Sequence, residues 1–510
     1  MSGPPPDKGT NLWLNAPLGY PWPLAGNPAG AHPGEALRLL PVSRLTDAQR
    51  SAVAELLRIA PVADDLGRRF LARNRRLYLV GGSVRDALLG RLGDDLDFAT
   101  DATPEEVLGL VKDWGTTWET GRAFGTIGVA RGSARCEITT FRAESYDPES
   151  RKPEVVYGDS LEGDLVRRDF TVNAMAVALP DHEFVDPFGG LKDLAKGVLK
   201  TPGAPEDSFT DDPLRMLRAA RFAAQLGFTP DQAVVAAMAG MAERIEIVSA
   251  ERIQVELSKL LLGKEPLRGL TLLVDTGLAD HVLPELPAMR LAIDAIHQHK
   301  DVYLHSLAVL ENAIRQEAEG PDLTLRMAAL LHDIGKPLTR AVGPDGVSFH
   351  HHEVVGAKLA RKRLRALKYP KQFVDDVCRL VELHLRFHTY RMGWTDAAVR
   401  RYVTDAGPLL DRLHKLVRSD CTTRNRARAE RLAASYDSLE DRIDELMKAE
   451  ELKRIRPDLD GREIMEILGI PPGPAVGRAY QYLLDQRMER GPIPHDEAVA
   501  LLQEWAASHL

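Results

Sequence analysis

Residues 77–98 read LYLVGGSVRDALLGRLGDDLDF, and this stretch decides how the amino-terminal half of the chain folds. The apolar run Leu77–Val80 predicts a short strand that stops at two glycines, and residues 84–89 predict a helix after the turn. A second strand is expected at the acidic run that follows. Because side chains two residues apart in a strand share a face, Asp95 and Asp97 should point together.

Two neighbouring carboxylates, Asp95 and Asp97, indicate a site for divalent metal ions. Asp95 and Asp97 would repel each other unless cations lay between them, and two Mg²⁺ ions about 3.5 to 4 Å apart are the usual device for in-line phosphoryl transfer. The backbone at Gly82 and the side chain of Arg85 can receive phosphate oxygens at the start of the helix. Glu137, which lies among strand-forming residues, is a candidate third carboxylate. For each motif alone, an ordinary turn or a solvated acid is the alternative.

Strand signals are confined to the first 200 residues. Residues 96–99, 126–130 and 137–141 predict further strands, and Pro104–Val111 predicts a helix between them. Beyond residue 210, helical periodicity dominates to the end of the sequence. An α/β unit is therefore expected to precede an all-helical remainder.

Length, composition and charge restrict the class of protein and the number of domains. The 510 residues are too many for one ordinary core, and 44% hydrophobic with 27% charged residues is typical of a globular protein. The net charge of −8 argues against nonspecific coating of nucleic acid but leaves room for local basic faces. No apolar run approaches the roughly 20 residues that cross a bilayer, so we expect a cytoplasmic protein with no membrane partner.

Several motifs resemble one family. Residues 79–91, followed by Asp95-Leu96-Asp97, resemble the head domain of bacterial and eukaryotic CCA-adding tRNA nucleotidyltransferases and their poly(A) polymerase relatives, in the polymerase β-like superfamily. Residues 167–176 resemble the family motif for sugar recognition, which includes Arg168. Residues 211–222 resemble the neck motif that selects the incoming base. One departure is Asp211, where the family usually has Glu.

The neck motif also has a physical interpretation. Asp212, Arg215, Arg218 and Arg221 are spaced by three, which predicts an oblique ridge along one side of a helix. Asp212 and Arg215 can hydrogen-bond a base edge, because one accepts and the other donates, while Arg218 and Arg221 face the triphosphate. Simple Asp–Arg pairing within a helix is the alternative.

Histidines and aspartates gather in the helical half. Within little over a hundred residues lie His305, His332, Asp333, residues 350–352 (all His), His384, His388 and Asp420. Residues 330–337, LLHDIGKP, resemble the central signature of the HD phosphohydrolase superfamily. The resemblance implies that four residues are the primary metal ligands: His305, His332, Asp333 and Asp420. It also implies two possible ligands of a second ion, His352 and His384. Mixed imidazole and carboxylate ligands suit Mn²⁺, Ni²⁺, Fe²⁺ or Zn²⁺ better than Ca²⁺.

The resemblance implies an α+β multidomain fold, with a small mixed-sheet nucleotidyltransferase head followed by an all-α neck, an HD domain and a helical tail. The expected boundaries are a disordered segment over 1–45, a head with lead-in helices over 46–200, a neck over 201–290, an HD domain over 291–430 and a tRNA-binding tail over 431–510.

The function that follows is template-independent addition of C, C and A to tRNA 3′ ends from CTP and ATP, with Mg²⁺ in the head. Poly(A) polymerase and an enzyme that adds only A are the nearest alternatives, and residues 121–126, GRAFGT, resemble the CCA type rather than poly(A) polymerases. A different class is an HD-type metal-dependent phosphohydrolase that acts on RNA ends or nucleotides, its head merely binding RNA. A non-catalytic RNA-binding scaffold comes third.

Overall fold

The computed structural model describes residues 61–91, 93–122, 125–145, 154–157, 160–290, 301–344, 346–423, 425–450 and 456–510. The segment expected to be disordered (1–45), the lead-in helix signals before residue 61, and two positions of the GRAFGT motif lie outside these ranges. The chain forms two compact units, one within residues 30–284 and one that includes Glu285–Leu510. Each is described by itself.

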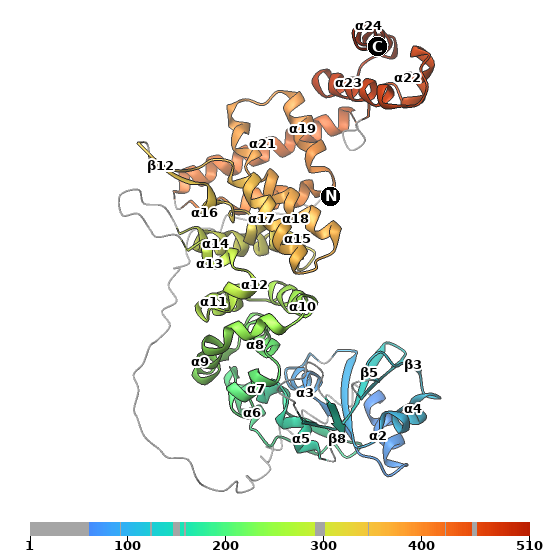
Figure 1. Ribbon diagram of the computed structural model, residues 1–510, viewed down its shortest axis with the longest axis vertical. Coiled ribbons are helices and arrows are strands. Elements are labelled where there is room, and N and C mark those ends of the chain that lie inside the picture. The colour runs from blue at the N-terminus through green and yellow to red at the C-terminus, as the bar shows by residue number, and fades with distance from the viewer. Residues whose placement is uncertain are drawn as a thin grey trace, which may run out of the picture. The chain divides into compact units, whose positions relative to one another are not determined.

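A seven-stranded mixed sheet forms the head, with strand order β3-β4-β5-β2-β1-β8-β9. Figure 1 labels β3, β5 and β8 of this sheet. Its strands are β1 (Leu77–Val80), β2 (Asp95–Thr100), β3 (Thr116–Trp118), β4 (Thr126–Arg131), β5 (Ala134–Thr140), β8 (Ala176–Leu179) and β9 (Phe184–Val185). Strands β2 and β5 are parallel, and the other neighbours are antiparallel. The short pair β6 (Arg142–Ser145) and β7 (Glu154–Tyr157) stands apart from this sheet.

Short helices complete the head: α2 (Pro61–Leu71), α3 (Gly82–Leu88), α4 (Pro104–Val111), α5 (Leu161–Val166), the 3₁₀ turn η2 (Thr171–Asn173) and α6 (Gly190–Lys196). Helix α4 has the bounds that the sequence predicted, because Thr103 and Glu106 form a capping box and Pro104 occupies the first turn. Phe70 of α2 and Phe98 of β2 are fully or almost fully buried in the core.

The neck is helical and belongs to the same unit. Its elements are α7 (Pro205–Asp211), α8 (Leu214–Leu226), α9 (Gln232–Met241), the 3₁₀ turn η3 (Ala242–Ile247), α10 (Ala250–Leu261), α11 (Pro266–Asp275) and α12 (Leu278–Val282), with the two-residue strands β10 (Val198–Leu199) and β11 (Thr229–Pro230) paired in parallel. Helices α10 and α11 both pack on α8, whose apolar face is buried. This packing holds α8 in place beside the head.

The second unit is almost entirely helical. Its elements are α13 (Glu285–Ala288), α14 (Val302–Arg315), α15 (Leu323–Leu331), α16 (Lys336–Thr339), β12 (Arg340–Gly343), β13 (Gly346–Phe349), α17 (His352–Ala366), α18 (Lys371–Leu383), η4 (Arg386–Met392), α19 (Asp396–Ala406), η5 (Gly407–Leu409), α20 (Leu410–Ser419), α21 (Arg426–Glu450), α22 (Gly461–Leu468), α23 (Pro474–Arg490) and α24 (His495–His509). Helix α15 is central, since residues 325–331 are all buried. The expected α+β fold class is confirmed.

Among the described residues, no helix is both long enough and apolar enough to span a bilayer.

Candidate functional site

Three carboxylates share one open face of the head sheet. Asp95 and Asp97 are exposed on β2, while Leu96 between them is buried on the opposite face. The parallel pairing of β2 with β5 places Glu137 beside Asp97, and Glu137 is exposed as well. The structure therefore brings together the two acids that alternation predicted and the third candidate.

The glycine turn lies against this face. Gly81 has φ of 68°, and a Cβ added to it would lie 2.6 Å from Nη1 of Arg168, so only glycine permits this approach. The hydroxyl of Ser83, in the first turn of α3, accepts a hydrogen bond from the N–H of Asp97 at 2.9 Å. This bond ties the turn to the carboxylate strand.

Arg85 is buried and already has partners. Its guanidinium donates to both carboxylate oxygens of Asp86, at 3.1 and 2.8 Å, and to Oδ1 of Asn173 at 2.5 Å. Arg85 lines the pocket described next, where a role toward phosphate remains a prediction.

A pocket of about 510 Å³ lies between the head and α8. Its walls include seven arginines and three aspartates, namely Arg85, Arg167, Arg168, Arg215, Arg218, Arg221, Arg252, Asp97, Asp169 and Asp212. The remaining walls come from Gly81, Gly82, Thr139, Asn173, Leu214 and Phe222. The volume suits a small-molecule ligand, and the excess of arginines suits one with several negative charges.

Asp97 stands at the acidic end of this pocket. Its side chain is reached by water, yet the surrounding protein displaces much of the solvent, and this desolvation raises its pKa. Glu137 and Asp95 raise the pKa further, whereas Arg168 and Arg85 oppose the shift. A divalent cation would stabilise the ionised form of Asp97, and the neighbouring carboxylates of Asp95 and Glu137 would complete an oxygen donor set for it.

The expected ridge on the neck helix is wrong at its first member. Asp212 lies between α7 and α8 with φ of −144° and ψ of 99°, because the proline after it disfavours the helical conformation. Its carboxylate accepts from the N–H of Leu214 at 3.1 Å and pairs with Arg252 at 2.7 Å. Arg252, on α10, was missed, since nothing in its surrounding sequence marks it.

Arg215 lines the pocket from the start of α8. Its guanidinium donates to the hydroxyl of Ser208 at 2.9 Å and to the backbone oxygen of Arg167. These bonds fix the side chain that the sequence assigned to base reading, and that role stays a prediction.

Buried acids hold the next two arginines. Arg218 donates through Nε and Nη2 to a single oxygen of Asp169, Oδ2. Although burial alone would raise the pKa of Asp169, this ion pair and bonds from Asn173 and a backbone N–H lower it to about 2. Arg221 pairs with Glu256 at 2.6 Å, and burial lowers the pKa of Arg221 to about 10. Sequence reasoning missed both acids, although Asp169 follows Arg168 directly in the motif of residues 167–176.

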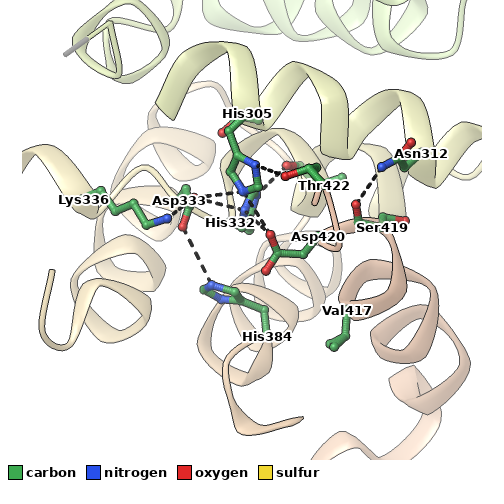
Figure 2. Close-up of polar contacts among 12 residues, drawn as sticks. His305, Asn312, His332, Asp333, Lys336, His384, Val417, Ser419, Asp420 and Thr422 are labelled. Carbon is green, nitrogen blue, oxygen red and sulfur yellow. Dashed lines mark hydrogen bonds and ion pairs between the residues drawn. The ribbon is translucent and has the colours of Figure 1, made fainter. Parts of the chain in front are cut away.

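The second unit contains a histidine–aspartate centre. Figure 2 shows His305, His332, Asp333, His384 and Asp420 of this centre. The sixth member is His352, whose Nε2 lies 3.1 Å from Oδ1 of Asp333. These residues come from α14, the carboxyl ends of α15, α18 and α20, and the start of α17. Nε2 of His305 lies 2.9 Å from Asp420 and 3.5 Å from Asp333. The structure thus brings together all six residues that the sequence predicted as ligands.

Three histidines of this centre bond the backbone through Nδ1 and turn Nε2 inward. Nδ1 of His332, His352 and His384 each lies 2.6 to 2.9 Å from a backbone oxygen three residues earlier, so Nε2 is left to face the centre. Within the described part of the chain, those three Nε2 atoms and Oδ1 of Asp333 are buried and make no well-aligned hydrogen bond. The Nε2 atoms of His332 and His352 nevertheless lie 3.2 and 3.1 Å from Asp333. Buried polar atoms rarely lack hydrogen-bond partners. A histidine that binds a metal through one ring nitrogen usually donates the other to a backbone oxygen or a carboxylate, as these three histidines are placed to do.

Asp333 joins two possible ligand groups. One consists of His305, His332 and Asp333, and the other of Asp333, His352 and His384, with the ligand atoms of each within 4.8 Å of one another. Burial together with neighbouring His332 lowers the pKa of His384 to about 3, so this imidazole is neutral and able to ligate. The donor set fits a divalent transition metal.

Two further side chains contact this centre. Nζ of Lys336 lies 2.5 Å from Oδ2 of Asp333, and the hydroxyl of Thr422 lies 3.1 Å from Nδ1 of His305 (Figure 2). Neither side chain was assigned a role from the sequence, although Lys336 belongs to the LLHDIGKP motif.

Three family models match the chain: a poly A polymerase head domain over residues 77–200, a probable RNA and SrmB-binding site of polymerase A over 227–289, and an HD domain over 302–447. The chain is 36% identical over 437 residues to the A-adding tRNA nucleotidyltransferase of Deinococcus radiodurans, which covers 84% of this chain and 95% of that protein.

Other relatives match a shorter part. The CCA-adding enzyme of Leuconostoc mesenteroides is 44% identical over 211 residues, which cover 41% of this chain and 51% of that enzyme, so the matching stretch spans about half of the relative. Among solved structures, the CCA-adding enzyme of Bacillus stearothermophilus in complex with CTP superimposes with a TM-score of 0.62 at 27% identity, over 88% of this chain and 98% of the other.

Proposed function

Because this chain belongs to the family of tRNA nucleotidyltransferases with a poly A polymerase head domain, we propose that it adds C, C and A to tRNA 3′ ends from CTP and ATP. The observation that carries the proposal is the pocket with seven arginines that opens beside Asp97. A triphosphate bound among these guanidiniums would have its α-phosphate near the three carboxylates of the sheet.

The chain's own residues would bind and orient the reactants. The 3′-hydroxyl of the RNA attacks the α-phosphate, a new phosphodiester bond forms, and the bond between the α- and β-phosphates breaks to release pyrophosphate. Arg168 and Arg85 line the wall beside Gly82, where the phosphates would lie, while Asp212 and Arg215 line the neck wall, where the base would lie.

Asp95 and Asp97 would hold Mg²⁺, with Glu137 as a further oxygen donor; the ions, when bound, would lower the charge barrier to attack and stabilise the leaving pyrophosphate. The arrangement of oxygen donors alone supports this choice of metal.

Addition of A alone is the second candidate. The relative that matches over 95% of its length is an A-adding enzyme, whereas the CCA-adding enzyme of Leuconostoc mesenteroides matches over 51% of its length at higher identity. Both candidates use the same pocket and differ only in which triphosphates enter it and when.

One assay separates them. Transcripts of one tRNA, ending before CCA and after CC, would be incubated with CTP, ATP or both, and the products resolved to single nucleotides. Three additions to the first transcript support the full series, and a single A on the second transcript alone supports the restricted activity. Extension of an unstructured RNA by a long A tract would instead indicate a poly(A) polymerase, and no extension at all would refute nucleotide addition.

For the second unit, we propose metal-dependent hydrolysis of a phosphomonoester or a 2′,3′-cyclic phosphate at an RNA end. The buried Nε2 atoms of His332, His352 and His384 carry this proposal, because among the described residues they make no well-aligned hydrogen bond and they gather around Asp333 as ligand atoms would. His305, His332, Asp333 and Asp420 would hold one ion, and His352 and His384 would complete a second set around Asp333. Water would then add across a P–O bond.

The test begins with binding. Protein treated with chelator and then dialysed against Mn²⁺, Ni²⁺, Fe²⁺ or Zn²⁺ would be assayed for bound metal by mass spectrometry, and then for release of phosphate from p-nitrophenyl phosphate and opening of a cyclic-phosphate RNA end. Retention of no metal by the intact chain would overturn the proposal.

A further inference from the structure

A row of paired residues crosses the open face of the head sheet. Trp118 of β3 pairs with Gly128 of β4, Gly128 pairs with Glu137 of β5, and Glu137 pairs with Asp97 of β2. Because directly paired residues share a face, the indole of Trp118 lies on the same side of the sheet as the carboxylates. This tryptophan belongs to none of the motifs described above, and it does not line the arginine-rich pocket.

The indole lies flat on the glycine. A Cβ added to Gly128 would lie 1.9 Å from Cε2 and 2.2 Å from Nε1 of Trp118, so the ring occupies the space of the missing side chain. One ring face therefore covers β4, and Trp118 as a whole is only half-buried. The guanidinium of Arg135, an exposed residue of β5, lies 5.7 Å from the ring centroid.

The arginine-rich pocket and Trp118 lie on different sides of Asp97. Apart from Asp97 and Thr139, the arginine-rich pocket is built from the turn after β1, residues 167–173 and the neck. In the strand order, β1 is on one side of β2, and β5, β4 and β3 are on the other. The tryptophan and the triphosphate pocket thus lie on opposite sides of the carboxylates, which is where an attacking group and a leaving group must be for in-line transfer.

We propose that Trp118 is a stacking platform for the last base of the RNA to be extended, and that Arg135 contacts the phosphate of that nucleotide. The proposal rests on the proposed nucleotide addition. Strands β4 and β2 are two spacings apart, about 10 Å. The indole covers β4, at one end of this span. A nucleotide stacked on the face turned away from Gly128, with the Arg135 guanidinium moved from that ring to the nucleotide's phosphate, brings its 3′-hydroxyl toward Asp97. Stacking on an aromatic ring tolerates any base, as a primer end that changes during synthesis requires.

A purely structural role makes a different prediction. An aromatic residue can stabilise a sheet simply by covering a glycine on the next strand. Leucine at position 118 would still cover Gly128 with apolar surface but would offer no ring for a base, whereas phenylalanine would keep both features. Trp118→Leu and Trp118→Phe are therefore the matched pair, and Trp394→Leu, in the second unit, controls for the loss of a tryptophan.

The experiment uses the full chain and a tRNA transcript that ends before CCA and carries 2-aminopurine at its last position. Without triphosphate, the wild-type protein and Trp118→Phe should quench the fluorescence of this base, and Trp118→Leu should not. In steady state, Trp118→Leu should raise KM for the transcript about tenfold, with KM for CTP and ATP unchanged. Arg135→Gln should raise the same KM and reduce its dependence on salt.

The outcomes separate this proposal from the function on which it rests. If the wild-type protein extends the transcript but Trp118→Leu has the wild-type quenching and KM, the platform is refuted and nucleotide addition stands. A lower melting temperature in Trp118→Leu with unchanged quenching would mean that the ring only covers Gly128. If the wild-type protein adds no nucleotide, the proposed function falls, and the quenching measurement still decides whether a base stacks on Trp118.

Discussion

At the scale of single residues, we expect Asp95 and Asp97 to bind metal and their neighbour Asp94 not to. Asp95 and Asp97 share the open face of β2, whereas Asp94 precedes the strand and contributes its backbone oxygen to the N–H of Arg135 at 2.8 Å. Asp95→Asn or Asp97→Asn should reduce nucleotide addition roughly a thousandfold, since each removes a charged metal ligand worth several kcal/mol. Affinity for tRNA, measured by filter binding, should change little. Asp94→Asn is the control and should keep activity; equal loss in all three variants would contradict the assignment.

The ionisation of Asp169 should make the stability of the same unit depend on pH. Its pKa is lowered from 3.8 to about 2 because it pairs with Arg218, so its ionised form is favoured by folding. This contribution is fully present above about pH 4 and is lost as the pH falls from there toward about 2. Asp169→Asn should therefore destabilise the unit by about 2 kcal/mol at pH 7. Hydrogen exchange of α8 peptides in a urea series would measure the difference, which should shrink on acidification; a difference that stays constant down to pH 2 would count against the ion pair.

At the scale of elements, local pattern predicted what lies within one strand or helix. Alternation placed Asp95 and Asp97 correctly, and the capping box fixed α4. The errors arose where elements meet. Asp212 was assigned to the helix because it lies three residues before Arg215, in the same spacing as the arginines. Pro213, which disfavours a helical conformation at the residue before it, should have been given more weight. Glu256 could not be found, since it reaches the arginines of α8 from another helix and no spacing along the chain encodes that contact.

Close packing between helices also sets the histidine–aspartate centre. A Cβ on Gly335 would lie 2.1 Å from the backbone oxygen of His352 and 2.7 Å from the N of Gly356, so Gly335→Ala should push the start of α17 away from Asp333. We expect metal affinity at this centre to fall about tenfold or more, as when supporting residues of metal sites are altered. Titration calorimetry with Mn²⁺ would measure it. Gly343→Ala is the matched control, because its Cβ would meet nothing closer than 4.0 Å. Equal effects in both variants would mean that the packing of α17 does not position His352.

At the scale of the whole molecule, the two sites belong to different compact units. The carboxylates and the pocket lie within residues 30–284, and the histidine–aspartate centre lies in the unit that includes Glu285–Leu510. The donor sets differ as well, oxygen alone in the first and imidazole with carboxylate in the second, so they favour different metals. With both proposed activities, this division predicts that nucleotide addition and phosphate hydrolysis have separate metal requirements.

The division predicts a double dissociation. His332→Ala removes a buried group of the second unit and should abolish metal retention and phosphate release there, while nucleotide addition stays within about twofold of wild type because sites in separate units are nearly additive. Asp97→Asn should do the reverse. Both activities would be measured on the same preparations, with thermal unfolding to verify that each variant is folded. Loss of both activities in a folded His332→Ala protein would mean that the centre in the second unit serves nucleotide addition, and the picture of two independent sites on one chain would have to be abandoned.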